Sequence, residues 1–208
     1  GRGRLVTASN DFGSICMSNE MVSSKYPSKQ VEQHRTINVD YDDWSEFVQD
    51  EFQNRMDDIG INVDQIHYSG FWSQGDGACF TGSVRDWEKY LAHLGYDDPI
   101  LLAEAKSHWV LSWEQSGFYC HHKSVVYHDE IYIGDNPYDE EEDTLRYDAW
   151  DAVIQQYDLL KLTEQMKEDI QEHAQELYRD LETEYNNRTS DEAVIQAMIF
   201  MEIEPETD

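Results

Sequence analysis

One stretch of the chain decides its fold class: residues 159–185 read LLKLTEQMKEDIQEHAQELYRDLETEY. Apolar residues recur there every three or four positions, at Leu159, Leu162, Met166, Ile170, Ala174, Leu177, Leu181 and Tyr185. This spacing places them on one face of a helix. The pattern predicts a long amphipathic helix that ends at residues 186–187, followed by a short helix through Met201 that Thr189 or Ser190 caps.

Upstream of this helix, the sequence alternates between helical and strand patterns. Apolar residues at helical spacing predict a helix with an acidic outer face over 44–56, which Gly60 ends. The same spacing predicts two further helices, at 86–94 and at 101–113. The segment 101–113 is also compatible with a strand. β-Branched and aromatic residues predict a hairpin at 63–84 and strands at 118–127 and 130–133.

These elements predict an α+β fold, a small antiparallel sheet packed against amphipathic helices with a long C-terminal helix. We expect residues 1–20 to be a flexible lead and residues 21–208 to form a single domain, with an acidic loop at 135–143 and an acidic C-terminal helical region.

The charge of the chain is strongly negative: its 208 residues carry 44 Asp and Glu against 15 Lys and Arg, a formal charge of −29. Such a chain repels phosphates, which excludes a conventional nucleic-acid binder. Its 6 Trp, 13 Tyr and 7 Phe favour a folded domain over a disordered polyanion. No apolar run is long enough for a membrane span and no signal-peptide core is visible, so we expect a cytoplasmic protein.

The most unusual string is HYSGFWSQGDGACFTG, residues 67–82. Its glycines could let a phosphate approach the backbone, but no nucleotide-binding glycine spacing and no Lys are present. The favoured interpretation is a tight hairpin turn at Gly75-Asp76-Gly77, with Trp72 and Phe80 buried in the core.

The cysteines and histidines offer candidate chemistry. Cys16, Cys79 and Cys120 are odd in number and widely spaced, which argues against disulfides and a structural zinc site. Cys79 could act as a nucleophile with a base among His67, His108, His121 and His122, but its acidic surroundings disfavour a thiolate.

Metal binding is also weighed against simpler interpretations. Cys120, His121, His122 and His128 could contribute to a zinc site, but exposed or core histidines are the favoured interpretation. The acidic loop 135–143 could bind Ca²⁺ weakly, yet it lacks EF-hand order and is better explained as a solvated charge run. We therefore expect neither a cofactor nor a metal site.

The sequence resembles a family of accessory proteins from tailed bacteriophages, uncharacterised or loosely labelled antitoxin-like. The matching stretches are INVDYDDW at 37–44, YSGFWSQGDGACFTG at 68–82, LETEY at 181–185 and TSDEAV at 189–194. The lead 1–20 and the acidic insert 135–143 depart from the family pattern. The resemblance implies a phage protein in the cytoplasm of an infected bacterium and carries over no catalytic residue.

Two hypotheses of function follow. The first is an acidic protein that binds and inhibits or modulates a basic host or phage protein, such as a nucleic-acid-binding enzyme, as a nucleic-acid mimic or an antitoxin-like factor. Residues 164–208 carry a net charge of −11, and a helix rise of about 1.5 Å per residue approaches the roughly 1.7 Å charge spacing of DNA.

The second hypothesis is a small enzyme or a nucleotide- or ligand-binding protein that uses the SQGDGACF turn and the histidines near Cys120. Across both hypotheses, the candidate binding residues are Trp72, Ser73, Gln74, Asp76, Asp139, Glu140, Glu141 and Glu142. No catalytic residue is assigned, and the oligomeric state stays open.

Overall fold

The computed structural model describes residues 26–206. They cluster into two compact units, a large unit over residues 42–186 and a small unit from residues 26–41 and 187–206. The division falls inside the range 21–208 that the sequence analysis treats as one domain. The predicted lead, residues 1–20, and Cys16 lie outside the described residues.

The four described strands of the large unit form one antiparallel sheet in the order β1-β2-β3-β4. They are β1 (Ile61–Tyr68), β2 (Ala78–Val84), β3 (Val110–Gln115) and β4 (Val125–Glu130). Tyr68 pairs with Ala78, Gly82 with Trp113 and Gln115 with Val125. Because neighbours in the sheet are also neighbours in the chain, the β1–β2 and β3–β4 loops lie at the same end.

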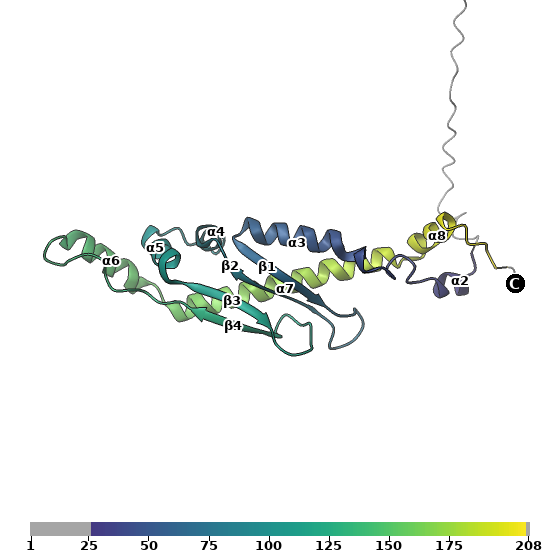
Figure 1. The fold of residues 1–208 in the computed structure, drawn as a ribbon, viewed down its shortest axis with the longest axis horizontal. Coiled ribbons are helices and arrows are strands. Elements are labelled where there is room, and N and C mark those ends of the chain that lie inside the picture. Colours follow the sequence, from purple (N-terminus) through teal and green to yellow (C-terminus); the bar gives the residue numbers. More distant parts are fainter. Residues whose placement is uncertain (1–25, 207–208) are drawn as a thin grey trace, which may run out of the picture. The chain divides into compact units, whose positions relative to one another are not determined.

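The helices of the large unit are η1 (Asp42–Ser45), α3 (Glu46–Asp58), α4 (Trp87–His93), α5 (Pro99–His108), α6 (Thr144–Gln156) and α7 (Leu159–Arg188). Helices α3 and α7 lie along the sheet, whereas α6 lies beyond its end (Figure 1). Phe52 of α3 meets Phe80 of β2 edge to face, with ring centroids 5.0 Å apart. The Tyr127 hydroxyl of β4 donates to Lys167 O of α7 at 3.2 Å.

The α+β fold and the long helix are confirmed. Met166, Ile170, Leu177 and Leu181 of α7 are all buried, as the helical spacing predicts. The helix continues through residues 186–187 to Arg188 rather than ending there.

The first helix agrees with its prediction except at one side chain. Gly60 follows the last turn of α3 with a φ of +87°, a left-handed conformation that suits glycine. Phe47, expected on the apolar face, is exposed, since Val48, Phe52 and Met56 fill the face toward the sheet.

Three boundaries in the middle of the chain are wrong. The predicted helix over 101–113 is two elements, because α5, which Asp98 caps, ends at His108 and β3 begins at Val110. Residues 118–124 form a loop and 131–133 are not a strand, so the two predicted strands are one, β4. Helix α6 was not predicted at all.

The small unit packs α2 (Ser28–Gln33) with α8 (Asp191–Phe200). Its core contains Tyr26, Val31, Val194, Ile195 and Met198. Ser190 caps α8, as predicted, by accepting a hydrogen bond from Ala193 N–H at 3.3 Å. The Tyr26 hydroxyl and the Gln30 amide donate to the carbonyls of Ile203 and Glu204.

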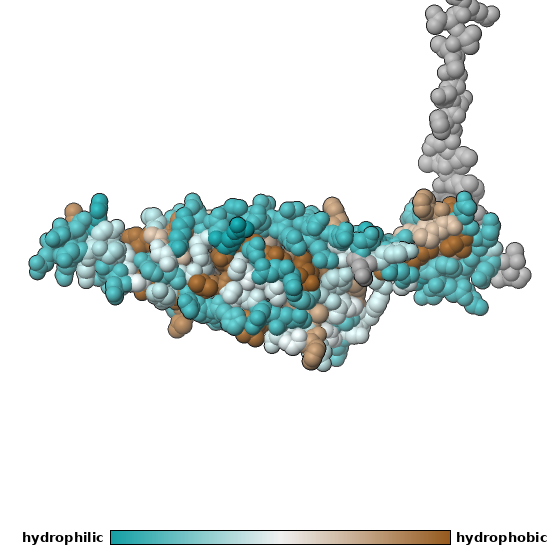
Figure 2. Space-filling view, in the orientation of Figure 1, coloured by the Kyte–Doolittle hydropathy of each residue, from teal (hydrophilic) through white to brown (hydrophobic). Residues whose placement is uncertain are grey.

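The surface is mostly hydrophilic on the face of the large unit that Figure 2 shows. None of the helices between residues 26 and 206 has both the length and the apolar character that a bilayer span needs.

Candidate functional site

The loops β1–β2 (69–77) and β3–β4 (116–124), here called the loop end, lie against each other. A Cβ on Gly77 would stand 2.7 Å from Cys120 O, and one on Gly75 would stand 3.7 Å from the Tyr119 ring. Gly77 is therefore required by the close approach of the second loop. The glycine-rich string forms a hairpin, as predicted, but the tight turn at Gly75-Asp76-Gly77 is wrong, because the longer loop 69–77 joins the two strands. This loop is half of a two-loop surface.

Asp76 holds the first loop in shape. Its Oδ2 accepts hydrogen bonds from the backbone N–H groups of Trp72 at 2.8 Å and Ser73 at 2.6 Å. The Asp76 N–H in turn donates to Ser73 O at 3.0 Å, and Ser69 Oγ accepts from Gly77 N–H at 3.2 Å. The Asp76 carboxylate therefore bonds to the loop backbone and fixes the directions of the Trp72 and Ser73 side chains.

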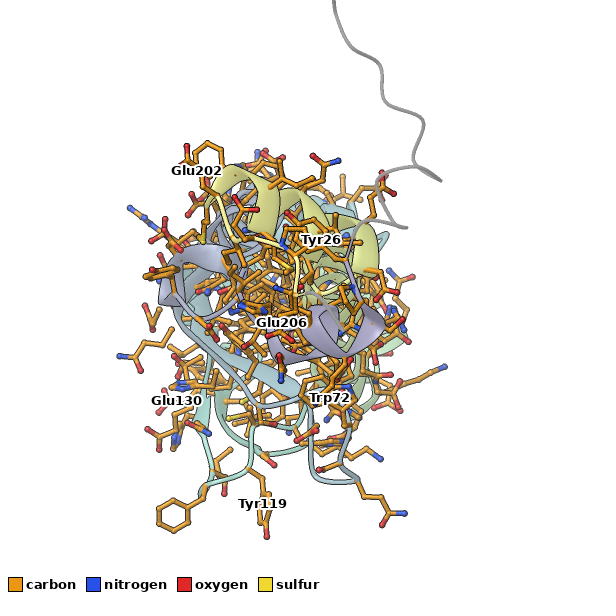
Figure 3. All side chains as sticks on the ribbon, turned by 90° about the vertical axis from the view of Figure 1, so that its right-hand side faces the viewer. Tyr26, Trp72, Tyr119, Glu130, Glu202 and Glu206 are labelled. Atoms are coloured by element: carbon orange, nitrogen blue, oxygen red, sulfur yellow. The ribbon has the colours of Figure 1, made fainter. Side chains whose placement is uncertain are left out.

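Large aromatic side chains project from both loops into solvent. Trp72 is 74% exposed, Tyr119 is 70% exposed and Phe118 is fully exposed; Trp72 and Tyr119 are labelled in Figure 3. The predicted burial of Phe80 is confirmed, but that of Trp72 is wrong. Trp72 lies in the loop, outside the strand alternation, and its neighbour Phe71 turns inward instead. Ser73 and Gln74 are exposed beside Trp72.

Phe71 anchors the loop in a cluster of aromatic rings. Its ring centroid lies 5.0 Å from Tyr185, 5.6 Å from Tyr178 and 6.2 Å from Trp44. Trp72 adds an edge-to-face contact with Tyr185 at 5.0 Å. Such pairs stabilise beyond their buried area, so the exposed indole is held on its inner side.

A pocket of about 210 Å³ opens between the loop end and α7. It brings together Asp76, His121, His122, Tyr178 and Arg179. The hairpin string contains no cation, but α7 supplies one in Arg179, about a hundred positions further along the chain. Sequence reasoning missed Arg179 because nothing local to α7 indicates that this part of the helix faces the hairpin.

His121 and His122 are adjacent in the second loop of the loop end. Their ring centroids lie 3.9 Å apart. Partial burial first, and then the charges of His121 and Lys123, lower the pKa of His122 to about 4. His122 is therefore neutral near pH 7, which leaves Arg179 as the permanent cation of the pocket.

Cys79 does not line this pocket. It is fully buried on β2, and burial first, then Cys120, raises the pKa of its thiol to about 11. The interpretation of Cys79 as a small hydrophobe is supported, and nucleophilic chemistry is disfavoured. His128, weighed as a zinc ligand with Cys120, instead pairs with Glu114 at 3.2 Å.

The acidic half of the predicted site lies elsewhere. Loop 135–143 follows the C-terminal end of β4, the end opposite the β3–β4 loop. Asp139 Oδ1 accepts from the N–H groups of Glu141 at 2.8 Å and Glu142 at 3.1 Å, while Glu140 O accepts from the Thr144 hydroxyl. The structure therefore does not bring Asp139–Glu142 together with Trp72.

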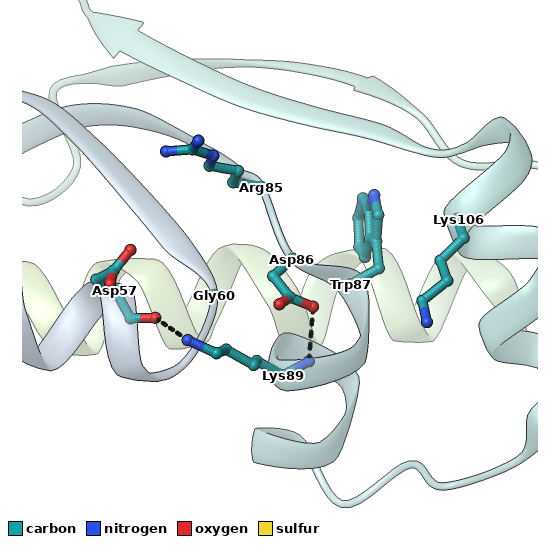
Figure 4. A pocket seen from close by; sticks show the side chains of 7 residues that line it. All are labelled: Asp57, Gly60, Arg85, Asp86, Trp87, Lys89 and Lys106. Atoms are coloured by element: carbon teal, nitrogen blue, oxygen red, sulfur yellow. Dashed lines mark hydrogen bonds between the residues drawn. The ribbon is translucent and has the colours of Figure 1, made fainter.

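A second pocket, of about 320 Å³, gathers Arg85, Lys89 and Lys106 beside Asp57 and Asp86 (Figure 4). Lys89 Nζ donates to Asp57 O at 3.0 Å. Lys106 Nζ pairs with Glu88 at 2.6 Å. Local oxygens thus hold two of the three cations, and we assign this pocket no ligand.

A family model described as a domain of unknown function, DUF8835, matches residues 44–191, and the chain belongs to this family. The matched range contains the loop end, the aromatic cluster and α7. No curated protein and no solved structure matches the chain.

Proposed function

We propose that this DUF8835 protein is an acidic binding protein that docks onto a basic protein through its loop end and inhibits or modulates it. One observation carries the proposal: Trp72, Phe118 and Tyr119 stand exposed on two adjoining loops. Exposed aromatic groups of this kind are typical of protein interaction sites, where Trp and Tyr dominate the energetic hot spots.

Contacts within the chain hold the β1–β2 loop of the loop end in place without a partner. The two hydrogen bonds to Asp76 and the ring contacts of Phe71 restrict the loop that bears Trp72. Ordering a flexible loop on binding costs free energy, and a loop already fixed avoids most of that cost. This rigidity supports a contact role for Trp72 over a merely tolerated surface aromatic.

The charge of the chain selects the kind of partner. A protein with a net charge of −29 attracts basic surfaces and accelerates their encounter. We assign this steering to the exposed carboxylates, including Asp139, Glu140, Glu141 and Glu142, and the short-range contact to the aromatic side chains. Nucleic-acid mimicry and antitoxin-like action are two modes that fit this division.

The proposed setting follows from the family resemblance. We place the protein in the cytoplasm of a phage-infected bacterium, where a basic nucleic-acid-binding enzyme is the chemical class of partner that fits. Direct binding to nucleic acid is not part of the proposal, because the like charges repel.

A ligand-binding protein is the second candidate, and the pocket that contains Arg179 is the observation that favours it. Arg179 provides the cation that the hairpin string lacks. The pocket volume of about 210 Å³ falls below the roughly 300–1,000 Å³ of most small-molecule sites. The buried Cys79 further weakens an enzymatic version.

Affinity capture from bacterial lysate tests the main proposal. The wild-type chain should retain a basic protein that a Trp72→Ala/Phe118→Ala/Tyr119→Ala variant loses. Phe47→Ala is the matched control, since Phe47 is an equally exposed aromatic on α3. Retention of the same protein by the triple variant would contradict the proposal, and loss only in Arg179→Ala would favour the pocket.

A further inference from the structure

Three metal-ligating side chains converge between α4 and α7. His93 is the last residue of α4, and Asp169 and His173 lie one turn apart on α7. Asp169 Oδ1 lies 2.9 Å from His93 Nε2 and 3.7 Å from His173 Nε2. The three ligand atoms all fall within 4.8 Å of one another.

A second layer of contacts orients these side chains. The Tyr90 hydroxyl donates to Asp169 Oδ2 at 3.1 Å, which leaves Oδ1 facing the histidines. His173 Nδ1 lies 3.4 Å from Glu176 Oε2. With Nδ1–H donating to this carboxylate, the lone pair of His173 is on Nε2 and faces the cluster. Carboxylate–histidine pairs of this kind commonly support metal ligands.

The hydrogen bonds around the cluster leave one polar atom, His173 Nε2, without a partner among the described residues. This atom is buried. The side chains of both His173 and Asp169 are only 15% exposed, so water has little access. A buried polar atom without a partner is costly, and a bound cation would satisfy it.

We propose that His93, Asp169 and His173 form a binding site for a divalent transition-metal ion, with zinc as the best-suited ion. Imidazole nitrogens suit zinc, whereas magnesium and calcium prefer oxygen ligands throughout. Tetrahedral zinc with bonds of about 2.0–2.2 Å sets ligand atoms roughly 3.3–3.6 Å apart. Two of the three separations, 2.9 and 3.7 Å, bracket that range, and the third lies within 4.8 Å.

His93 Nε2 and Asp169 Oδ1 share a hydrogen bond in the metal-free chain. Zinc takes the Nε2 lone pair, so a neutral His93 gives up its Nε2 proton and takes one at Nδ1 from solvent, and the ligand stays a neutral imidazole. Water takes the fourth position, because the His93 side chain is partly exposed. The ion then ties α4 to α7.

This site departs from the sequence expectation of no metal and is independent of the proposed partner. His93 and Asp169 are 76 positions apart, so no ligand spacing in the sequence reveals them. Only the one-turn spacing of Asp169 and His173 on a helix is visible in the sequence.

Zinc titration of the full chain, stripped with a chelator, tests the site by calorimetry in a buffer with a weak competing ligand. We expect one Zn²⁺ per chain and a higher melting temperature with Zn²⁺ present. His93→Gln and His173→Gln should each weaken affinity at least tenfold, and Glu176→Gln, which removes a supporting contact, about tenfold. His128→Gln is the matched control and should bind as wild type.

The acidic surface provides the competing explanation, weak adsorption of zinc to exposed carboxylates. Equal affinity in His93→Gln and His128→Gln, or no bound Zn²⁺ in the wild type, would overturn the site. Circular dichroism of each variant without metal checks its folding. His93→Gln keeps the test decisive if His173→Gln fails to fold, because His93 lies at the surface end of α4. Co²⁺ should give the strong visible absorption of a tetrahedral site in the wild type and in His128→Gln, and not in His93→Gln or His173→Gln.

Discussion

The glycine-rich string divides into two regions with opposite environments. Residues 71–76 form a loop from which Trp72 projects into solvent. Residues 78–82 form most of β2, where Cys79 and Phe80 are buried. Both regions contain aromatic side chains and a glycine, and their backbone context separates them.

This contrast shows that an aromatic residue beside a turn has two possible roles. In β2 the side chains fill the core between the sheet and its helices, so they serve stability. In the loop, Asp76 fixes the backbone and Phe71 takes the inward position, which frees Trp72 for contact with another molecule. Mutations should therefore separate stability from binding within a single string.

The largest expected loss of stability comes from substitution of Phe80. Phe80→Ala should lower the free energy of unfolding by about 3–5 kcal/mol, because it empties a core site between Phe52 and Trp113. Trp72→Ala should cost about 1 kcal/mol or less, since the indole is exposed and loses only its edge contacts with Phe71 and Tyr185. Urea unfolding measures both values. Equal costs would remove the distinction between the two regions.

Substitution of Asp76 tests whether the hydrogen bonds of its carboxylate keep the loop 69–77 rigid. Asp76→Ala should cost about 1–2 kcal/mol and increase amide exchange at Trp72 and Ser73, whose N–H groups lose their acceptor. Asp139→Ala is the matched control, because it removes a similar acceptor from the loop 135–143. An unchanged exchange rate at Trp72 would show that the carboxylate does not hold the loop.

These differences also define what the sequence could predict. The spacing of Leu162, Met166 and Ile170 predicts α7 because a helix repeats its contacts every turn. The break between α5 and β3 at Trp109 is not visible, since apolar residues continue on both sides and strand pairing decides the outcome.

The site itself is less predictable than the fold. The hairpin follows from local chemistry and is predicted, but its connection is the loop 69–77 rather than a tight turn at Gly75-Asp76-Gly77. The exposure of Trp72 is not predicted, because it depends on Phe71 occupying the space beside Tyr185. Arg179 and the pairing of His93 with Asp169 depend on contacts between distant segments, which no local pattern encodes.

His122 should make a smaller contribution to the free energy of unfolding, and this contribution depends on pH. The folded chain lowers the pKa of His122 from its usual 6.5 to about 4, so the unfolded chain binds more protons between these values. The contribution of neutral His122 to stability is therefore complete above pH 6.5 and is lost as pH falls toward 4. Melting temperatures between pH 7 and 5 should decline less steeply in His122→Gln than in the wild type. An identical decline would refute this assignment.

Cys79 should show the smallest effect of all on function. Its thiol is buried and its pKa is raised to about 11, so alkylation of the folded protein near neutral pH should be slow. Cys79→Ser should keep partner binding with a modest loss of stability. Fast labelling, with loss of activity at unchanged stability in Cys79→Ser, would support the enzyme instead.

Affinity for the captured basic partner tests the central claim most directly, measured for the wild type, Trp72→Ala and Phe47→Ala at about 50 and 500 mM salt. The account predicts that Trp72→Ala weakens binding by at least about 30-fold, as for a hot-spot residue, while its melting temperature stays close to that of the wild type. Phe47→Ala should bind within about twofold of the wild type, and high salt should weaken every complex because charge steering is screened. Wild-type affinity in Trp72→Ala together with no dependence on salt would contradict the account.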